Sequence, residues 1–139
     1  MSALLTIGLL PVLLVVLATT LELGALRVVA ARAHSAADIA ALVAVNDQDD
    51  AELLRSGRLR LASDAVDVAR TVFADNLQAI EGILADSPAV IAASAAVTAD
   101  AMPPTVRIAA TIRVRTPVFG ILFFHPVTDV VIKTAGGAR

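Results

Sequence analysis

The chain opens with a run of apolar side chains that is long enough to cross a lipid bilayer. No charged residue stands between Met1 and Leu21, and Glu22 is the first. The hydrocarbon core of a bilayer requires about 20 apolar helical residues. The stretch from Leu4 to Leu21 comes close to that length. The pattern therefore predicts a membrane-spanning helix at the start of the chain.

The helical pattern continues beyond the apolar run. From Glu22 to Val45 the sequence is rich in Ala, Leu and Arg, which are strong helix formers, and polar side chains recur at helical spacing. One helix from about Leu4 to Val45 would be about 60 Å long and would project well out of a membrane. Pro11 lacks a backbone donor, so we expect a kink there.

Small residues and one early charge suit this helix to contacts with other helices. Small side chains allow two helix backbones to approach closely. We predict packing between neighbouring chains through Glu22, Gly24, Ala33, Ala36, Ala37, Ala40 and Ala41. For Glu22 two interpretations stay open: a side chain in headgroups or water at the membrane surface, or a charge that pairs with a neighbouring chain.

An acidic break and a second helix follow. The break at 46–50 is interpreted as a solvated loop, because Glu52 and Arg58 stand where a calcium-binding EF-hand needs Gly and Glu. The segment 52–61 is expected to hold one or two helical turns around Gly57. Ser63 and Asp64 begin the second helix and 86–88 end it. Its predicted core face consists of Ala69, Phe73, Leu77, Ile80 and Leu84.

The last third of the chain carries strand signals. Residues 89–99 are compatible with a strand, 102–104 form a turn, and 105–115 alternate strictly between apolar and other side chains. An apolar stretch at 118–124 lies between Pro117 and Pro126. A final strand is expected at 127–135, with Asp129 and Lys133 pointing outward and 136–139 as a frayed end.

These elements predict an α+β fold with two parts. A long N-terminal transmembrane and projecting helix occupies 1–45. A small α+β domain occupies 46–139, with the second helix and a small antiparallel sheet of three or four strands.

Composition and charge narrow the function. The 139 residues are 58% hydrophobic, well above the usual share for a soluble domain. The net charge is −2, Lys133 is the sole lysine and there is no Trp or Tyr, which argues against nucleic-acid binding. Without Cys, disulfides, thiolate metal sites and cysteine nucleophiles are excluded.

No constellation of catalytic residues is visible. His34 has Asp38 one helical turn on and can pair with it, while His125 lies between Phe124 and Pro126; both are interpreted as structural. Phosphate-binding loops, metalloprotease motifs and nucleophile elbows are absent from the sequence. We therefore predict that the protein is not an enzyme and has no cofactor and no metal.

A cleaved secretory signal is the rival interpretation of the apolar run. Such a signal has a basic start, a shorter apolar core and a small-residue cleavage site. Here no Lys or Arg precedes the run, and the candidate site at Ala18-Thr19-Thr20 ends in Thr. A retained anchor is favoured, and a secreted domain stays as the third hypothesis.

Two stretches of the long helix resemble a known family. Leu9-Leu10-Pro11, the apolar run and then Leu21-Glu22-Leu23-Gly24 resemble the pattern of TadE-like pilins. The segment from Ala31 to Leu42 resembles an Ala-rich stretch of TadE/TadG-like proteins. These proteins belong to tight-adherence (Flp) pilus systems, a branch of the type IV pilin superfamily.

The resemblance implies a structural pilin-like subunit, minor or major, anchored by its N-terminal helix and assembled by helix packing. Its implied partners are other pilin subunits, the inner-membrane pilus assembly platform and membrane lipid. The alternative is a bitopic accessory or scaffold protein that stays in the bilayer.

The resemblance also implies a location. The protein would lie in the bacterial inner membrane as a single-pass protein with its C-terminal domain outside the cytoplasm, or in an extracellular filament. Arg27 and Arg32 alone would favour a cytoplasmic C-terminus, and we follow the resemblance. An acidic residue that such pilins carry near the mature N-terminus corresponds to Leu5 here. No basic leader precedes Met1, so either a leader was removed or this member is not processed in that way.

Overall fold

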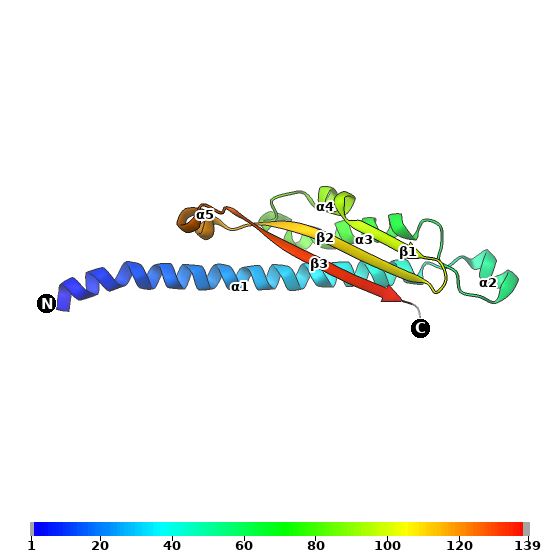
Figure 1. The fold of residues 1–139 in the computed structure, drawn as a ribbon, viewed down its shortest axis with the longest axis horizontal. Helices are drawn as coiled ribbons and strands as arrows, with labels where there is room; N and C mark the ends of the chain where they lie inside the picture. Colours follow the sequence, from blue (N-terminus) through cyan, green and yellow to red (C-terminus); the bar gives the residue numbers. More distant parts are fainter. Residues whose placement is uncertain (1, 138–139) are drawn as a thin grey trace.

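A single long helix organises the whole molecule. The computed structural model describes residues 2–137, with side chains described from residue 7 onward. Helix α1 (Ser2–Asn46) runs unbroken through Pro11, and 45 residues make it about 67 Å long. Figure 1 shows the other elements packed along its second half, while its N-terminal half extends away from them. The long helix is confirmed; the first turns curve off its axis in Figure 1, and the kink at Pro11 stays a prediction.

A short helix caps the far end of the molecule. Helix α2 (Asp50–Ser56) begins after Asp49, whose Oδ1 accepts the backbone N–H of Glu52 at 3.1 Å. It ends at Gly57, which adopts a left-handed conformation with φ 66° that costs glycine little. The one or two turns expected around Gly57 are therefore present, and they precede it. Figure 1 places α2 at the opposite end of the molecule from the N-terminus.

The predicted second helix is present and its apolar face is buried. Helix α3 (Ala65–Leu77) continues into a 3₁₀ helix, η1 (Gln78–Ile83). The predicted core face is buried throughout: Ala69, Phe73, Leu77, Ile80 and Leu84.

One segment expected as a strand is a helix. Helix α4 (Pro88–Ser94) occupies most of 89–99, and only the short strand β1 (Ala96–Asp100) remains of that prediction. The reason is local, because Pro88 stands in the first turn and the Ser87 hydroxyl accepts the backbone N–H of Val90. Pro88, predicted only to end the second helix, therefore also begins α4.

The sheet has three strands in the described residues. Strands β1, β2 (Thr105–Arg115) and β3 (Val127–Gly137) lie in that order and pair antiparallel. The alternation predicted for β2 is confirmed: Val106, Ile108, Ala110, Ile112 and Val114 are all buried. The predicted frayed end was wrong for Gly136 and Gly137, which belong to β3, while Ala138 and Arg139 lie outside the described residues. Asp129 and Lys133 are exposed, as expected.

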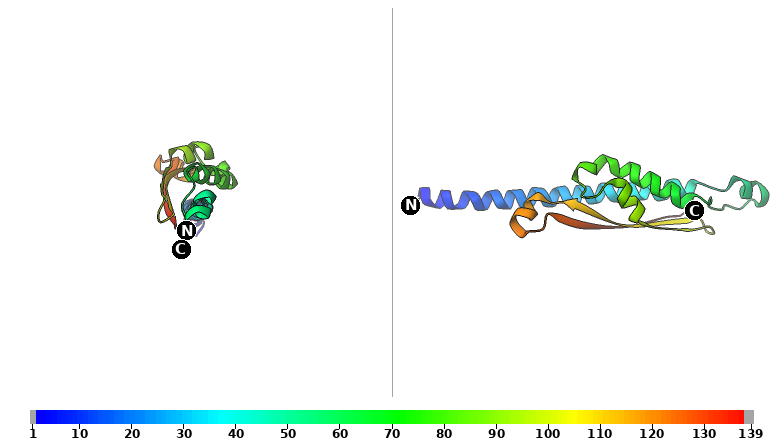
Figure 2. Two further views of the ribbon diagram at one scale, coloured as in Figure 1. Left: turned by 90° about the vertical axis from the view of Figure 1, so that its right-hand side faces the viewer. Right: turned by 90° about the horizontal axis from the view of Figure 1, so that it is seen from above.

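The hydrophobic core lies between the sheet and two helices. The end-on view in Figure 2 shows the strands on one side and α1 and α3 on the other. Buried residues of α1 from Val29 to Val45 form one cluster with Phe73, Ile108 and Ile132. The second half of α1 therefore belongs to the folded domain. Residue 46 is the end of a helix that contributes to the core of this domain.

Candidate membrane and subunit contact surfaces

Every residue of α1 from Ile7 to Leu17 is exposed. Eleven large apolar side chains between Ile7 and Leu23 are 43–72% exposed. Burying one such side chain is worth about 1.5–3 kcal/mol, so leaving this set half exposed in water would cost on the order of 10 kcal/mol. That equals the whole stability of a typical domain. This segment is the one helix among the described residues that is long and apolar enough to cross a membrane.

The alanine stripe predicted to contact neighbouring chains is covered by the chain's own domain. Ala33, Ala36, Ala37, Ala40 and Ala41 are 0–4% exposed. Helix α1 packs there against α3 and β3. These small residues allow the backbones of α1 and β3 to approach closely. A Cβ on Gly136 of β3 would come within 3.1 Å of the Ala41 carbonyl. The expectation that these five side chains pack between subunits therefore does not hold in this structure, and the contact is intramolecular.

Gly24 differs from the alanines. It lies on an open face of α1, and a Cβ built on it meets no atom within 4 Å. Of the small residues proposed for packing between subunits, it is the one that stays accessible, and its role remains a prediction.

Glu22 is held within the chain by a segment far away in sequence. Its side chain is 9% exposed. Its Oε1 accepts the backbone N–H of Val118 at 3.0 Å, and its Oε2 accepts that of Phe119 at 2.7 Å. Val118 and Phe119 lie in the first turn of α5 (Pro117–Phe123), the helix that joins β2 to β3. Neither open interpretation of Glu22 describes this arrangement, in which its carboxylate caps a helix of its own subunit.

The structure explains why α5 was not expected. The stretch 118–124 is bounded by two prolines and consists of β-branched, aromatic and aliphatic residues that suit a strand. Pro117 fits the first turn of a helix, and the carboxylate of Glu22 satisfies two amides that lack partners at a helix start. Glu22 was recognised in the sequence, but its partner 96 residues away was not.

An apolar groove lies beside this contact. It has a volume of about 400 Å³ and is lined from α1 by Ala18, Leu21 and Ala25, among others. Its opposite wall comes from the end of β2 and the start of α5, including Val114, Arg115 and Pro117. The groove thus lies where the exposed apolar half of α1 meets the folded domain.

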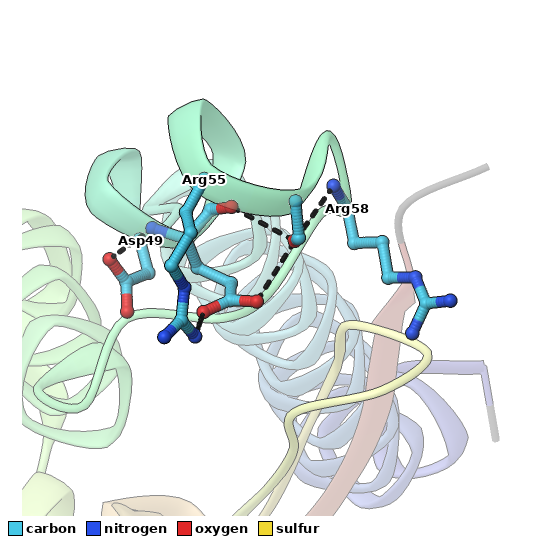
Figure 3. Close-up of polar contacts among 5 residues, drawn as sticks. Asp49, Arg55 and Arg58 are labelled. Atoms are coloured by element: carbon cyan, nitrogen blue, oxygen red, sulfur yellow. Dashed lines mark hydrogen bonds and ion pairs between the residues drawn. The ribbon is translucent and has the colours of Figure 1, made fainter.

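The far tip of the molecule is a second exposed region. Figure 3 shows the polar contacts of α2, where Glu52 pairs with Arg55 and accepts the hydroxyl of Ser56 at 2.9 Å. Leu54 is 89% exposed on this helix. The backbone N–H of Asp49 donates to the carbonyl of Arg60 at 2.9 Å, which closes the base of the tip.

The two histidines take part in no metal cluster in the described residues. No group of three or more His, Cys, Asp or Glu side chains that could hold an ion is found in that part of the chain. Asp38 accepts a hydrogen bond from the Thr134 hydroxyl of β3, so this carboxylate contacts the sheet and not His34. His34 and His125 are both exposed.

Comparison with known proteins adds one finding. A family model described as a putative Flp pilus-assembly TadE/G-like family matches residues 1–47. Over these residues the chain is similar to that family. The resemblance read from Leu9 to Leu42 is thereby confirmed, and the match supports involvement in a Tad/Flp pilus. No curated protein and no solved structure shows a significant match.

The TadE/G-like segment coincides with α1 and stops just after it. It contains the exposed apolar half, Glu22 and the alanines that pack into the domain. An N-terminal apolar helix together with a pilus family fits a membrane-anchored or pilus-associated protein.

Proposed function

We propose that the protein is a structural pilin-like subunit, minor or major, of a Tad/Flp-type pilus. The observation that carries the proposal is the TadE/G-like match over a helix whose residues from Ile7 to Leu17 are all exposed. Such a surface must be covered by lipid or by other helices, because leaving its apolar side chains exposed to water would cost on the order of 10 kcal/mol of free energy. A pilus subunit meets both environments in turn.

The mechanism we propose is physical and involves no catalysis. The exposed half of α1 holds the subunit in the inner membrane, where it is available to the assembly platform. During assembly it exchanges lipid for the helices of neighbouring subunits. Lipid already buries this surface, so close packing decides which helices associate. Gly24 and the apolar side chains between Ile7 and Leu23 are the surfaces open to such contacts, since the alanine stripe is covered.

The proposed topology places the folded domain outside the cytoplasm. The chain contains no Cys, so single cysteines report position without interference. One position is Leu54 at the far tip, where the native residue is 89% exposed, and it is replaced by cysteine (Leu54→Cys). We expect a membrane-impermeant maleimide to label it from outside the inner membrane, and to label Ser2→Cys only after permeabilisation. The reverse labelling would contradict the topology.

Assembly into a filament is tested separately. Surface filaments are sheared from cells, purified and analysed by mass spectrometry. Finding this chain in them supports the subunit role, whereas finding it only in membranes favours the alternative, a bitopic accessory or scaffold protein. Normal pili and normal surface adhesion after deletion of the gene would contradict the subunit role.

A further inference from the structure

The loop between β2 and β3 exposes large apolar side chains that the fold does not cover. Ile121 is 80% exposed, Phe123 58% and Phe124 87%. No charged side chain occurs from Thr116 to Phe124. Apolar groups gathered in this way on a surface mark a contact with a membrane or a partner.

The loop is built to hold these side chains outward. Its base is closed by Thr116, whose N–H donates to the Pro126 carbonyl at 2.8 Å and whose hydroxyl donates to the His125 carbonyl at 3.0 Å. Gly120 packs so closely that a Cβ would come within 3.1 Å of Pro126. The rings of Phe119 and Phe123 meet edge to face at 5.9 Å. The exposed side chains thus stand on a closed, internally bonded turn.

The position of the loop along α1 identifies what covers it. Glu22, the first charged residue after the apolar run, bonds the amides of Val118 and Phe119. Ala18 and Leu21 line one groove together with Pro117. Figure 1 shows α5 beside α1 at the end of the sheet nearer the N-terminus. The loop therefore lies beside the last turns of the span, at the level where a spanning helix leaves the hydrocarbon.

The charges around the loop also fit the surface of a bilayer. Arg115, just before the apolar cluster, and His125, just after it, are both exposed, so a polar side chain flanks the cluster at each end in sequence. Glu22 is directed inward, where two backbone amides satisfy its carboxylate. An acid placed there would otherwise oppose contact with lipid.

We propose that α5 and Phe124 form a second membrane contact, seated in the interface of the bilayer that α1 crosses. Lipid is the occupant because one apolar groove, lined by Leu21 of the span and by Pro117 and Val118 of α5, joins the two apolar surfaces. Interfacial elements bind in this way, with apolar side chains at the boundary between headgroups and acyl chains. The inference rests on the proposed placement of α1 across the membrane.

The test uses the absence of Trp from the chain. Three single-tryptophan proteins are reconstituted, one copy per nanodisc, in phosphatidylcholine and phosphatidylglycerol. Phe124→Trp reports the loop. Leu54→Trp is the matched control, because the two native residues are 87% and 89% exposed but lie at opposite ends of the domain. Leu14→Trp marks the span.

We expect the Phe124→Trp emission to be shifted to the blue and quenched by lipids brominated near the headgroup end of the acyl chain. Leu54→Trp should show red-shifted emission that responds to aqueous acrylamide and not to brominated lipid. If brominated lipid quenches Leu14→Trp while Phe124→Trp behaves like Leu54→Trp, the membrane contact of the loop is refuted and the placement of α1 across the membrane is supported. If brominated lipid also leaves Leu14→Trp unquenched, the placement of α1 across the membrane is refuted. A blue-shifted Phe124→Trp that brominated lipid leaves unquenched indicates burial by protein and overturns the proposal.

Discussion

Replacing Glu22 by Gln tests whether its carboxylate holds α5 against α1. The change keeps the size of the side chain and one oxygen acceptor, but turns an NH₂ group toward one of the two amides at Val118 and Phe119. A hydrogen bond to a charged group contributes about 1.5–3 kcal/mol. Losing one of the two bonds should therefore destabilise the docked position of α5 by about 1.5–3 kcal/mol.

This free energy is measurable as amide exchange. A loss of about 1.4 kcal/mol changes an opening equilibrium tenfold, so the change corresponds to about tenfold to hundredfold faster exchange. The assay is hydrogen exchange of the Val118 and Phe119 amides in nanodiscs, by NMR or by mass spectrometry of peptides covering 116–124. Amides in β2 should keep their protection, because the opening is local.

The control for this experiment is Glu81→Gln. Glu81 lies in η1 and is exposed, so the same chemical change removes no buried acceptor there. Unchanged exchange at the two α5 amides in Glu22→Gln would refute the reasoning. Equal acceleration in Glu81→Gln would refute it too, since the effect would then come from the loss of charge alone.

Two further substitutions test the packing of α1 into the domain. Ala40→Leu inserts methylenes at a site that is 0% exposed and should lower the free energy of unfolding by about 1–3 kcal/mol, whereas Ala31→Leu on the exposed face should change it little. Thermal unfolding followed by circular dichroism in detergent compares the pair, and equal midpoints would contradict the buried stripe. Gly136→Ala should also destabilise, because its Cβ would meet the backbone of Ala41 at 3.1 Å, while Gly24→Ala in open space should be neutral or stabilising by up to about 1 kcal/mol. A Gly136→Ala protein as stable as the Gly24→Ala protein would show that β3 and α1 are not in close contact.

Regular patterns in the sequence predicted the elements whose structure is decided locally. The strict alternation from Thr105 to Arg115 defines β2 residue for residue, and the helical spacing of Ala69, Phe73 and Leu77 identifies the buried face of α3. In both, one side of the element is apolar and the other is not, so the periodicity itself reveals the structure. The long helix α1 was predictable because strong helix formers stand on both sides of its one proline, Pro11.

Elements decided by distant contacts were not predictable in this way. Helix α5 depends on Glu22 for two acceptors, and the Ala-rich stripe of α1 depends on β3, which lies at the other end of the chain. Small residues at helical spacing indicate close packing but do not say whether the partner is another chain or the same one. Helix α4 was missed because its sequence mixes Ala, which favours a helix, with Val and Ile, which favour a strand, and the cap at Ser87 decides for the helix.

The dependence of α1 on β3 has a consequence for how the protein folds. The helix is synthesised first, but the strand that covers its inner face is synthesised last. Asp38, for example, accepts its hydrogen bond from Thr134, which is synthesised 96 residues later. Such non-local contacts slow folding and leave surfaces uncovered in the meantime. Alanine offers far less apolar area than leucine, so a waiting stripe of alanines is less prone to premature association. We therefore expect the choice of alanine to protect the nascent chain as well as to permit close packing in the finished one.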